Sequence, residues 1–192
     1  MAGGRGWVAS IAVRASSRWS LAFALILVIS ACGDDEAESG TSADTVADAG
    51  IEPNNDASGD PLVATDLVNL DGETVATGTL TGEPLVLNFW FSTCVPCRKE
   101  LPDFAEVDAE LAGAVRFVGV NPFQPSETEE RFARDLGVEF ELLYDPDGEL
   151  VSGLGLSRFP VTLLVTAEGT VVDQTGALSA DELRQLIRQH LL

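Results

Sequence analysis

Residues 88–104 read NFWFSTCVPCRKELPDF and contain two of the three cysteines of this 192-residue chain, Cys94 and Cys97. Their spacing suits a redox-active disulfide, half of a zinc site, or a pair of small buried side chains. The apolar run before them, Leu85 to Phe91, has the length and composition of a strand that is covered on both faces. A helix is expected from about Pro96 through Leu111. The stretch therefore predicts a strand and a helix with the cysteines at their junction.

Strand and helix patterns alternate on both sides of this unit. Before it, Asp71-Gly72 lies between alternating apolar residues and predicts a β-hairpin. After it come, in order, a strand, a helix, a short strand with a turn, a second hairpin and a last helix. Capping boxes at Ser126–Glu129 and Ser179–Glu182 indicate where the two later helices begin. This order predicts an α/β fold, with a central mixed sheet, helices on both faces and an N-terminal β-hairpin.

The first 31 residues have the layout of a signal peptide. Three arginines and no acid precede the apolar run LAFALILVIS, which is too short to span a bilayer comfortably. Ile29-Ser30-Ala31-Cys32 resembles the bacterial lipobox, in which the cysteine is diacylated and becomes the mature N-terminus. We therefore expect export and lipidation at Cys32. An uncleaved signal anchor that happens to end in cysteine is the alternative.

An acidic segment follows the predicted lipidation site. Residues 33–60 contain nine acids and neither lysine nor arginine, a composition that favours a flexible tether. The predicted organisation is a signal peptide at 1–31, a lipidated cysteine and tether at 32–60, and one domain at 61–192. After the signal peptide the chain has 31 acids and 8 bases, a net charge near −23. Such a charge argues against nucleic acid as a partner.

The composition also argues against a metal at the cysteine pair. A structural zinc site needs four ligands, and the chain has no second cysteine pair and a single histidine, His190. The same shortage argues against a Cys–His nucleophile. Nothing in the sequence indicates an organic cofactor either.

Redox chemistry fits the pair better. A cysteine at a helix N-terminus has its thiolate stabilised by unpaired N–H groups and by the helix dipole. We predict that Cys94 attacks a substrate and that Cys97, in the first turn, resolves the mixed disulfide. A static disulfide or two buried thiols are the alternative, but a bridge that closes so short a loop adds little stability.

The segment NFWFSTCVPCRKELP resembles the active-site segment of the thioredoxin superfamily, and specifically that of the exported TlpA/ResA-like disulfide reductases. The segments VGVNPFQ, LLYDPDG and SRFPVTLLVTAEGTVV follow in that family's order, from about Asp66 to the C-terminus. The resemblance implies a thioredoxin-like fold. It also implies that Pro160 is a cis-proline facing the cysteines and that Phe159 offers backbone groups to a substrate peptide. Apart from the resemblance, Pro160 would be expected to follow a trans peptide bond and Phe159 to be an ordinary packing residue.

By the same resemblance, Glu100 matches the family's active-site glutamate, which exchanges protons with the thiols. It lies three residues after Cys97 on the same helix face, although a solvated carboxylate is the alternative. Trp90 is expected to be a core residue that also forms a wall of the substrate site. Two positions depart from the pattern. Thr93 replaces a common tryptophan and leaves substrate preference open, and Asn88 replaces thioredoxin's buried aspartate, which favours Glu100 for proton exchange.

These features predict a membrane-anchored, extracytoplasmic thiol–disulfide oxidoreductase. The absence of a histidine between the cysteines favours a reductase over an oxidase. Such a reductase needs a membrane electron donor, because its compartment is oxidising. The resemblance implies protein thiols or disulfides as substrates, with apocytochrome c in cytochrome c maturation as the family's best-known task.

Two alternatives remain open. A peroxiredoxin-like thiol peroxidase would use Cys94 against a hydroperoxide, but the expected Thr or Ser three residues earlier is replaced by Phe91. A non-enzymatic lipoprotein would instead bind a partner through a thioredoxin-like surface.

Overall fold

The computed structural model describes residues 53–192. The predicted signal peptide, Cys32 and most of the acidic tether lie outside the described residues. The elements of the described part are β1 (Asp66–Val68), β2 (Thr74–Ala76), the 3-10 helix η1 (Thr77–Thr79), β3 (Leu85–Phe89), α1 (Val95–Leu111), β4 (Arg116–Asn121), α2 (Glu127–Asp135), β5 (Glu141–Tyr144), α3 (Glu149–Gly153), β6 (Val161–Val165), β7 (Val171–Thr175) and α4 (Ala180–His190). None of the helices within residues 53–192 has the length and apolar character needed to cross a membrane.

The strands form one mixed sheet in the order β2-β1-β5-β4-β3-β6-β7. β3, β4 and β5 are parallel, while β1 pairs antiparallel with β5 and β6 pairs antiparallel with β3. The hairpins β1–β2 and β6–β7 form the two edges. The predicted mixed sheet and both predicted hairpins are therefore confirmed.

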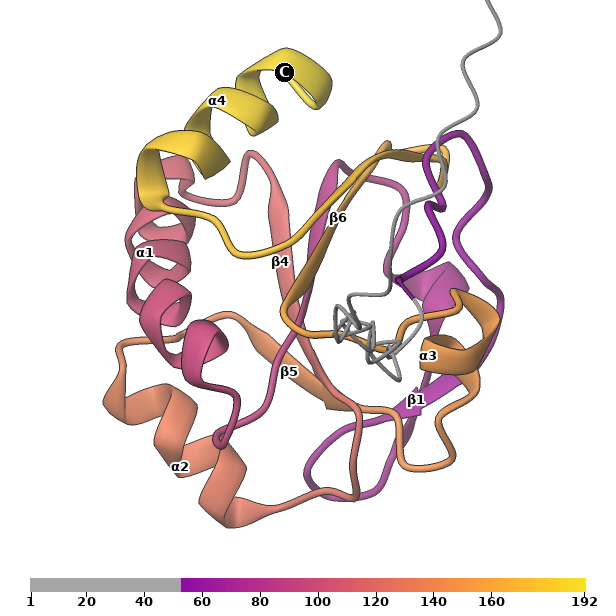
Figure 1. The fold of residues 1–192 in the computed structure, drawn as a ribbon, viewed down its shortest axis with the longest axis vertical. Helices are drawn as coiled ribbons and strands as arrows, with labels where there is room; N and C mark the ends of the chain where they lie inside the picture. Colours follow the sequence, from indigo (N-terminus) through magenta and orange to yellow (C-terminus); the bar gives the residue numbers. More distant parts are fainter. Residues whose placement is uncertain (1–52) are drawn as a thin grey trace, which may run out of the picture. The chain divides into compact units, whose positions relative to one another are not determined.

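Helices cover both faces of this sheet. α1, α2 and α4 lie on one side and α3 lies on the other (Figure 1). The central strand β3 is buried along its whole length, and its alternate residues enter opposite cores. Val86 packs in the cluster beneath α1, α2 and α4, whereas Leu87 packs in the cluster with Leu150 of α3. This two-sided burial explains why the strand reads as a continuous apolar run.

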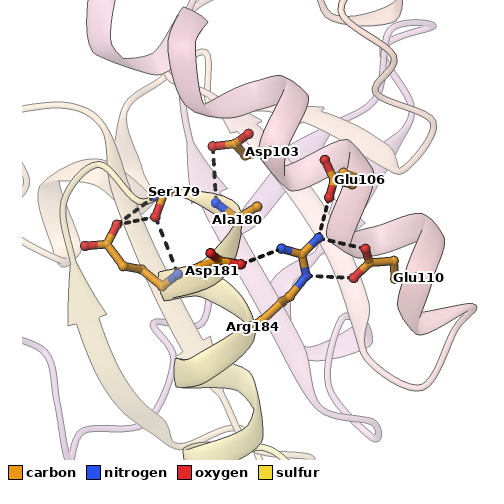
Figure 2. A network of polar contacts seen from close by, with 8 residues as sticks. Asp103, Glu106, Glu110, Ser179, Ala180, Asp181 and Arg184 are labelled. Atoms are coloured by element: carbon orange, nitrogen blue, oxygen red, sulfur yellow. Dashed lines mark hydrogen bonds and ion pairs between the residues drawn. The ribbon is translucent and has the colours of Figure 1, made fainter.

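Polar contacts as well as packing join α4 to α1 (Figure 2). The carboxylate of Asp103 in α1 accepts a hydrogen bond of 3.1 Å from the backbone N–H of Ala180, the first residue of α4. From α4, Arg184 donates to Glu106 and Glu110 of α1. The helix that carries both cysteines at its start is therefore attached to the C-terminal helix along its second half.

The two predicted capping boxes have different outcomes. The box at Ser179 is confirmed, since its hydroxyl and the Glu182 carboxylate bond each other's backbone N–H groups. Ser126 also accepts a bond from the backbone N–H of Glu129, at 3.4 Å. The Glu129 carboxylate, however, accepts a 2.8 Å bond from the backbone N–H of Ser92 in the loop before α1. At Ser126, therefore, the predicted bond to the serine hydroxyl is confirmed. The predicted return bond from the Glu129 carboxylate to the Ser126 backbone is wrong, because that carboxylate bonds to donors from another loop.

The folded domain begins earlier in the chain than predicted. Residues 54–60, which were assigned to the tether, pack on the domain. The side-chain oxygen of Asn54 accepts hydrogen bonds from the backbone N–H groups of Ser157 and Arg158, at 2.7 and 2.8 Å, and Ala57 is buried. The segment is held on the domain mainly by hydrogen bonds rather than by apolar packing. Its composition is therefore polar, and a polar composition is also typical of a flexible linker.

Candidate active site

Cys94 and Cys97 form a disulfide at the start of α1, with Cα atoms 5.3 Å apart. Cys94 is the N-cap residue of α1, and its Sγ accepts a hydrogen bond of 3.3 Å from the backbone N–H of Cys97. Pro96 lies in the first turn, where its missing N–H leaves no helical bond unmade. Cys94 is 7% exposed and Cys97 is completely buried. The exposure favours Cys94 as the sulfur that a substrate reaches first, although the order of attack stays a prediction.

The surroundings of Cys94 suit a thiolate once the disulfide is reduced. The N–H groups of the first turn point toward this end of the helix, and the dipole has its positive end here. The first turn of α1 contains no acidic residue. Arg98 and Lys99 follow directly, and the Arg98 guanidinium lies 5.2 Å from the centre of the Phe132 ring. The N–H groups, the helix dipole and the absence of an acid favour negative charge on the sulfur, whereas the Arg98 guanidinium is engaged with the Phe132 ring.

Glu100 is buried one turn after Cys97, with 2% of its surface exposed. Its Oε1 accepts a 2.8 Å bond from Asn88 Nδ2, and its Oε2 accepts a 3.1 Å bond from the backbone N–H of Leu178. Burial raises the pKa of this carboxyl from 4.5 to about 7, against the lowering effect of the two hydrogen bonds. The alternative of a solvated helix carboxylate is therefore wrong. A carboxyl with such a pKa exists in both forms near neutral pH, as proton exchange with a thiol requires.

Asn88 positions Glu100 from the central strand β3. Its buried amide nitrogen donates to Glu100 and also, at 3.1 Å, to Thr162 Oγ1 of β6. The amide thus connects the carboxyl of α1 to two strands of the sheet. Sequence reasoning noted Asn88 only as a residue that cannot act as a base. The signal of its structural role was a polar side chain within the apolar run LVLNFWF.

The peptide bond between Phe159 and Pro160 is cis, as predicted. Pro160 is buried, while Phe159 is half-buried and packs against the hydrophobic cluster that contains both cysteines. The structure therefore places Phe159 against the cluster of the disulfide, with Pro160 joined to it by the cis bond. Their contact with a substrate stays a prediction.

Trp90 lies in the core and has no exposed surface. Its ring stacks on Phe132 with 6.3 Å between centroids, in the same cluster as the two cysteines. A Cβ atom at Gly119 would approach the indole nitrogen to 2.8 Å, so this glycine makes room for the ring. The prediction that Trp90 binds substrate is corrected, because a substrate cannot contact a fully buried ring. Trp90 supports the site from within the core.

Glu129 of α2 fixes the loop between β3 and α1, a contact that sequence reasoning missed. Its carboxylate accepts hydrogen bonds from the backbone N–H and the hydroxyl of Ser92, and a 2.9 Å bond from Asn121 Nδ2. The Asn121 side-chain oxygen accepts a further 3.1 Å bond from the backbone N–H of Phe123. The loops that follow β3 and β4 are thus tied together beside the disulfide.

The position of the disulfide defines the class of this protein. A bridge that caps the helix after the central parallel strand, on a mixed sheet covered on both faces, is the arrangement of a thioredoxin-like thiol–disulfide oxidoreductase. The sequence model of the AhpC/TSA family matches residues 58–174, and the chain belongs to that family.

Known proteins agree with this class. Over 127 residues the chain is 29% identical to the thiol-disulfide oxidoreductase ResA of Halalkalibacterium halodurans, covering 64% of this chain and 72% of that protein. Over 107 residues it is 31% identical to ResA of Bacillus subtilis, covering 55% and 60%. A solved structure of a secreted Mycobacterium tuberculosis disulfide oxidoreductase, homologous to E. coli DsbE, matches with a TM-score of 0.57 and 29% identity, covering 65% of this chain and 95% of that one. The predicted TlpA/ResA-like resemblance and thioredoxin-like fold are confirmed.

Proposed function

We propose that this protein is a membrane-anchored, extracytoplasmic reductase of protein disulfides. The observation that carries the proposal is the position of Cys94, which caps α1, is bonded to Cys97 and keeps part of its surface exposed. The similarity to a secreted oxidoreductase supports an extracytoplasmic location. The signal-peptide pattern and the lipobox-like sequence before Cys32 support anchoring through a lipid.

The reaction transfers two electrons from the reduced protein to the substrate. The Cys94 thiolate attacks one sulfur of a substrate disulfide, so that a mixed disulfide forms and the other substrate sulfur leaves and takes up a proton. Cys97 then loses its proton and attacks the Cys94 sulfur, which releases the second substrate thiol and restores the Cys94–Cys97 bridge. Glu100, with a pKa of about 7, serves as the group that exchanges a proton with Cys97.

Each cycle leaves the protein oxidised, and a further reductant must restore the dithiol. Because the compartment outside the membrane is oxidising, we propose a dithiol donor held in the membrane. A polypeptide with an accessible disulfide, such as oxidised apocytochrome c, is the proposed substrate. Its backbone would lie against Phe159, which packs against the cluster that contains both cysteines, and against Pro160, which follows it through a cis peptide bond.

Titration of the full-length protein against defined thiol buffers tests the direction of this reaction. A reductase should give a reduction potential well below about −200 mV, whereas a disulfide donor would lie near about −120 mV. The Cys97→Ser variant should accumulate the mixed disulfide with substrate, while Cys94→Ser should form none. A potential near that of a disulfide donor, or trapping by Cys94→Ser instead, would contradict the proposal.

The two alternative functions give different results in the same assays. A peroxidase would consume hydroperoxide through Cys94 without needing a disulfide substrate. A binding lipoprotein would keep its partner when both cysteines are replaced by serine, and it would show no reversible titration of the pair.

A further inference from the structure

Three phenylalanine rings form a continuous row beside the disulfide. The ring of Phe91 meets that of Phe123 at 5.4 Å and that of Phe159 at 5.6 Å, both edge to face. Phe91 and Phe159 pack against the cluster that contains both cysteines. The carbonyl of Phe91 also accepts a 3.1 Å bond from the backbone N–H of Cys94. These three residues are called the phenylalanine row below.

The outer end of the row faces solvent. Phe123 is 55% exposed, and it is one of three large hydrophobic side chains that are exposed within residues 53–192. A second, Val95, is 62% exposed and directly follows Cys94, while the third is the C-terminal Leu192. Single exposed apolar side chains are ordinary, but a group of them beside a functional site indicates a binding surface. Here one exposed side chain, Phe123, ends the row of rings, and another, Val95, adjoins Cys94 in the chain.

Hydrogen bonds hold the row in place from both ends. At the exposed end, Asn121 accepts a bond from the backbone N–H of Phe123, and both Asn121 and Ser92 donate to Glu129. At the inner end, Asn54 accepts a 2.8 Å bond from the backbone N–H of Arg158, directly before Phe159. A surface that is already ordered loses little conformational entropy when it binds. The row is therefore suited to a specific contact.

We propose that the phenylalanine row docks a large apolar side chain of the substrate polypeptide, carried within a few residues of the disulfide that Cys94 attacks. This inference rests on the proposed function and names the kind of substrate. The row lies beyond the carboxyl ends of β3 and β4, the end of such a sheet where ligands bind. Its central residue, Phe91, is bonded through its carbonyl to the backbone of Cys94, which is 7% exposed, and Thr93 directly before Cys94 offers only a small polar side chain. The chain's net charge of −20 disfavours an acidic segment as the occupant.

The test uses the full-length protein and two disulfide peptides that differ at one position. One peptide carries phenylalanine two residues from its cysteine, and the other carries serine there. With an added dithiol that returns the protein to its reduced form, and with the uncatalysed rate subtracted, the wild type should reduce the phenylalanine peptide with a kcat/KM roughly tenfold higher than the serine peptide. One large apolar contact contributes discrimination of that order. In Phe123→Ser the kcat/KM values for the two peptides should differ by no more than about twofold, mainly because KM for the phenylalanine peptide rises. Its reduction potential and its rate with hydroxyethyl disulfide should match the wild type.

Leu192→Ser is the matched control, since Leu192 is 68% exposed but lies at the far end of α4. This variant should keep the full preference for the phenylalanine peptide. Equal rates for the two peptides in the wild type, or an unchanged preference in Phe123→Ser, would overturn the docking inference and leave the proposed function standing. If the wild type reduces neither peptide nor hydroxyethyl disulfide, the proposed function fails and the docking inference fails with it.

Discussion

At the scale of single residues, the buried carboxyl of Glu100 predicts how stability depends on pH. Its pKa is about 7 in the folded protein, against 4.5 ordinarily. Between these values the folded protein keeps a proton that the unfolded chain has lost, so this group's contribution to the free energy of unfolding falls as the pH rises. The full change is roughly 3 kcal/mol, at about 1.4 kcal/mol for each pKa unit. Glu100→Gln should remove this pH dependence. As the pH rises from about 5 to about 8, the free energy of unfolding of the variant should therefore increase relative to that of the wild type.

Denaturant unfolding of the oxidised protein at several pH values measures this difference. Glu83→Gln, which changes an exposed carboxyl before β3, should follow the wild type at every pH. If the difference between Glu100→Gln and the wild type stays constant with pH, the raised pKa of Glu100 is wrong.

The residues of the site differ in how far the sequence could predict them. The cysteine pair was predictable because its spacing and its place at a helix start are local features. The burial of Glu100 was not, because its partners Asn88 and Leu178 are 12 and 78 residues away along the chain. The predicted bond between the Glu129 carboxylate and Ser126 was wrong for the same reason. Its capping-box pattern was local, but its donor Ser92 is 37 residues away.

At the scale of elements, the segment 54–60 positions the loop before the cis-proline. The side chain of Asn54 accepts bonds from Ser157 and Arg158 and donates a 2.9 Å bond to the Arg158 carbonyl. Asn54→Ala should loosen this loop and raise KM for a peptide disulfide about threefold to tenfold, because the substrate must then order the loop on binding. Steady-state kinetics with a peptide and with hydroxyethyl disulfide measure the change, and the small disulfide should react at the wild-type rate.

Two variants separate this positioning from general loss of stability. Asn54→Asp keeps an oxygen that accepts from the two N–H groups but places its other oxygen against the Arg158 carbonyl, so it should recover only part of the wild-type KM. Asn55→Ala leaves the neighbouring backbone contacts intact and should have the wild-type KM. Equal rate losses for the peptide and the small disulfide in Asn54→Ala would show that the segment contributes to stability alone.

Regular elements were predictable where their signals are local. The helix expected from about Pro96 through Leu111 is observed as Val95–Leu111, because a cap and an apolar face define it. Residues 54–60 were misassigned, since their hydrogen bonds reach loops more than a hundred residues away. A local pattern of composition contains no information about such partners.

At the scale of the whole molecule, fold class was more predictable than strand order. Alternating strand and helix patterns indicate a sheet covered on both faces. Periodicity does not indicate which strands are neighbours, and β1 pairs with β5 across more than seventy residues of sequence. The functional face depends on this order, because the loops after β3 and β4 meet only when these two strands are adjacent and parallel.

Net charge also acts on the whole molecule, and it predicts a salt dependence of the reaction. A chain with a net charge of −20 should attract cationic substrates and repel anionic ones at low salt, where charges act over more than about 10 Å. Two disulfide peptides with identical residues around the cysteine, one with a lysine tail and one with a glutamate tail, measure this effect. The lysine peptide should react several-fold faster at low salt, and the two rates should converge as salt is added, because screening removes the long-range term and leaves the contacts at the site.

A faster glutamate peptide at low salt would contradict this expectation and would mean that Arg98 and Lys99, directly after the disulfide, outweigh the net charge. Replacing both cations by alanine would then abolish that reversed preference.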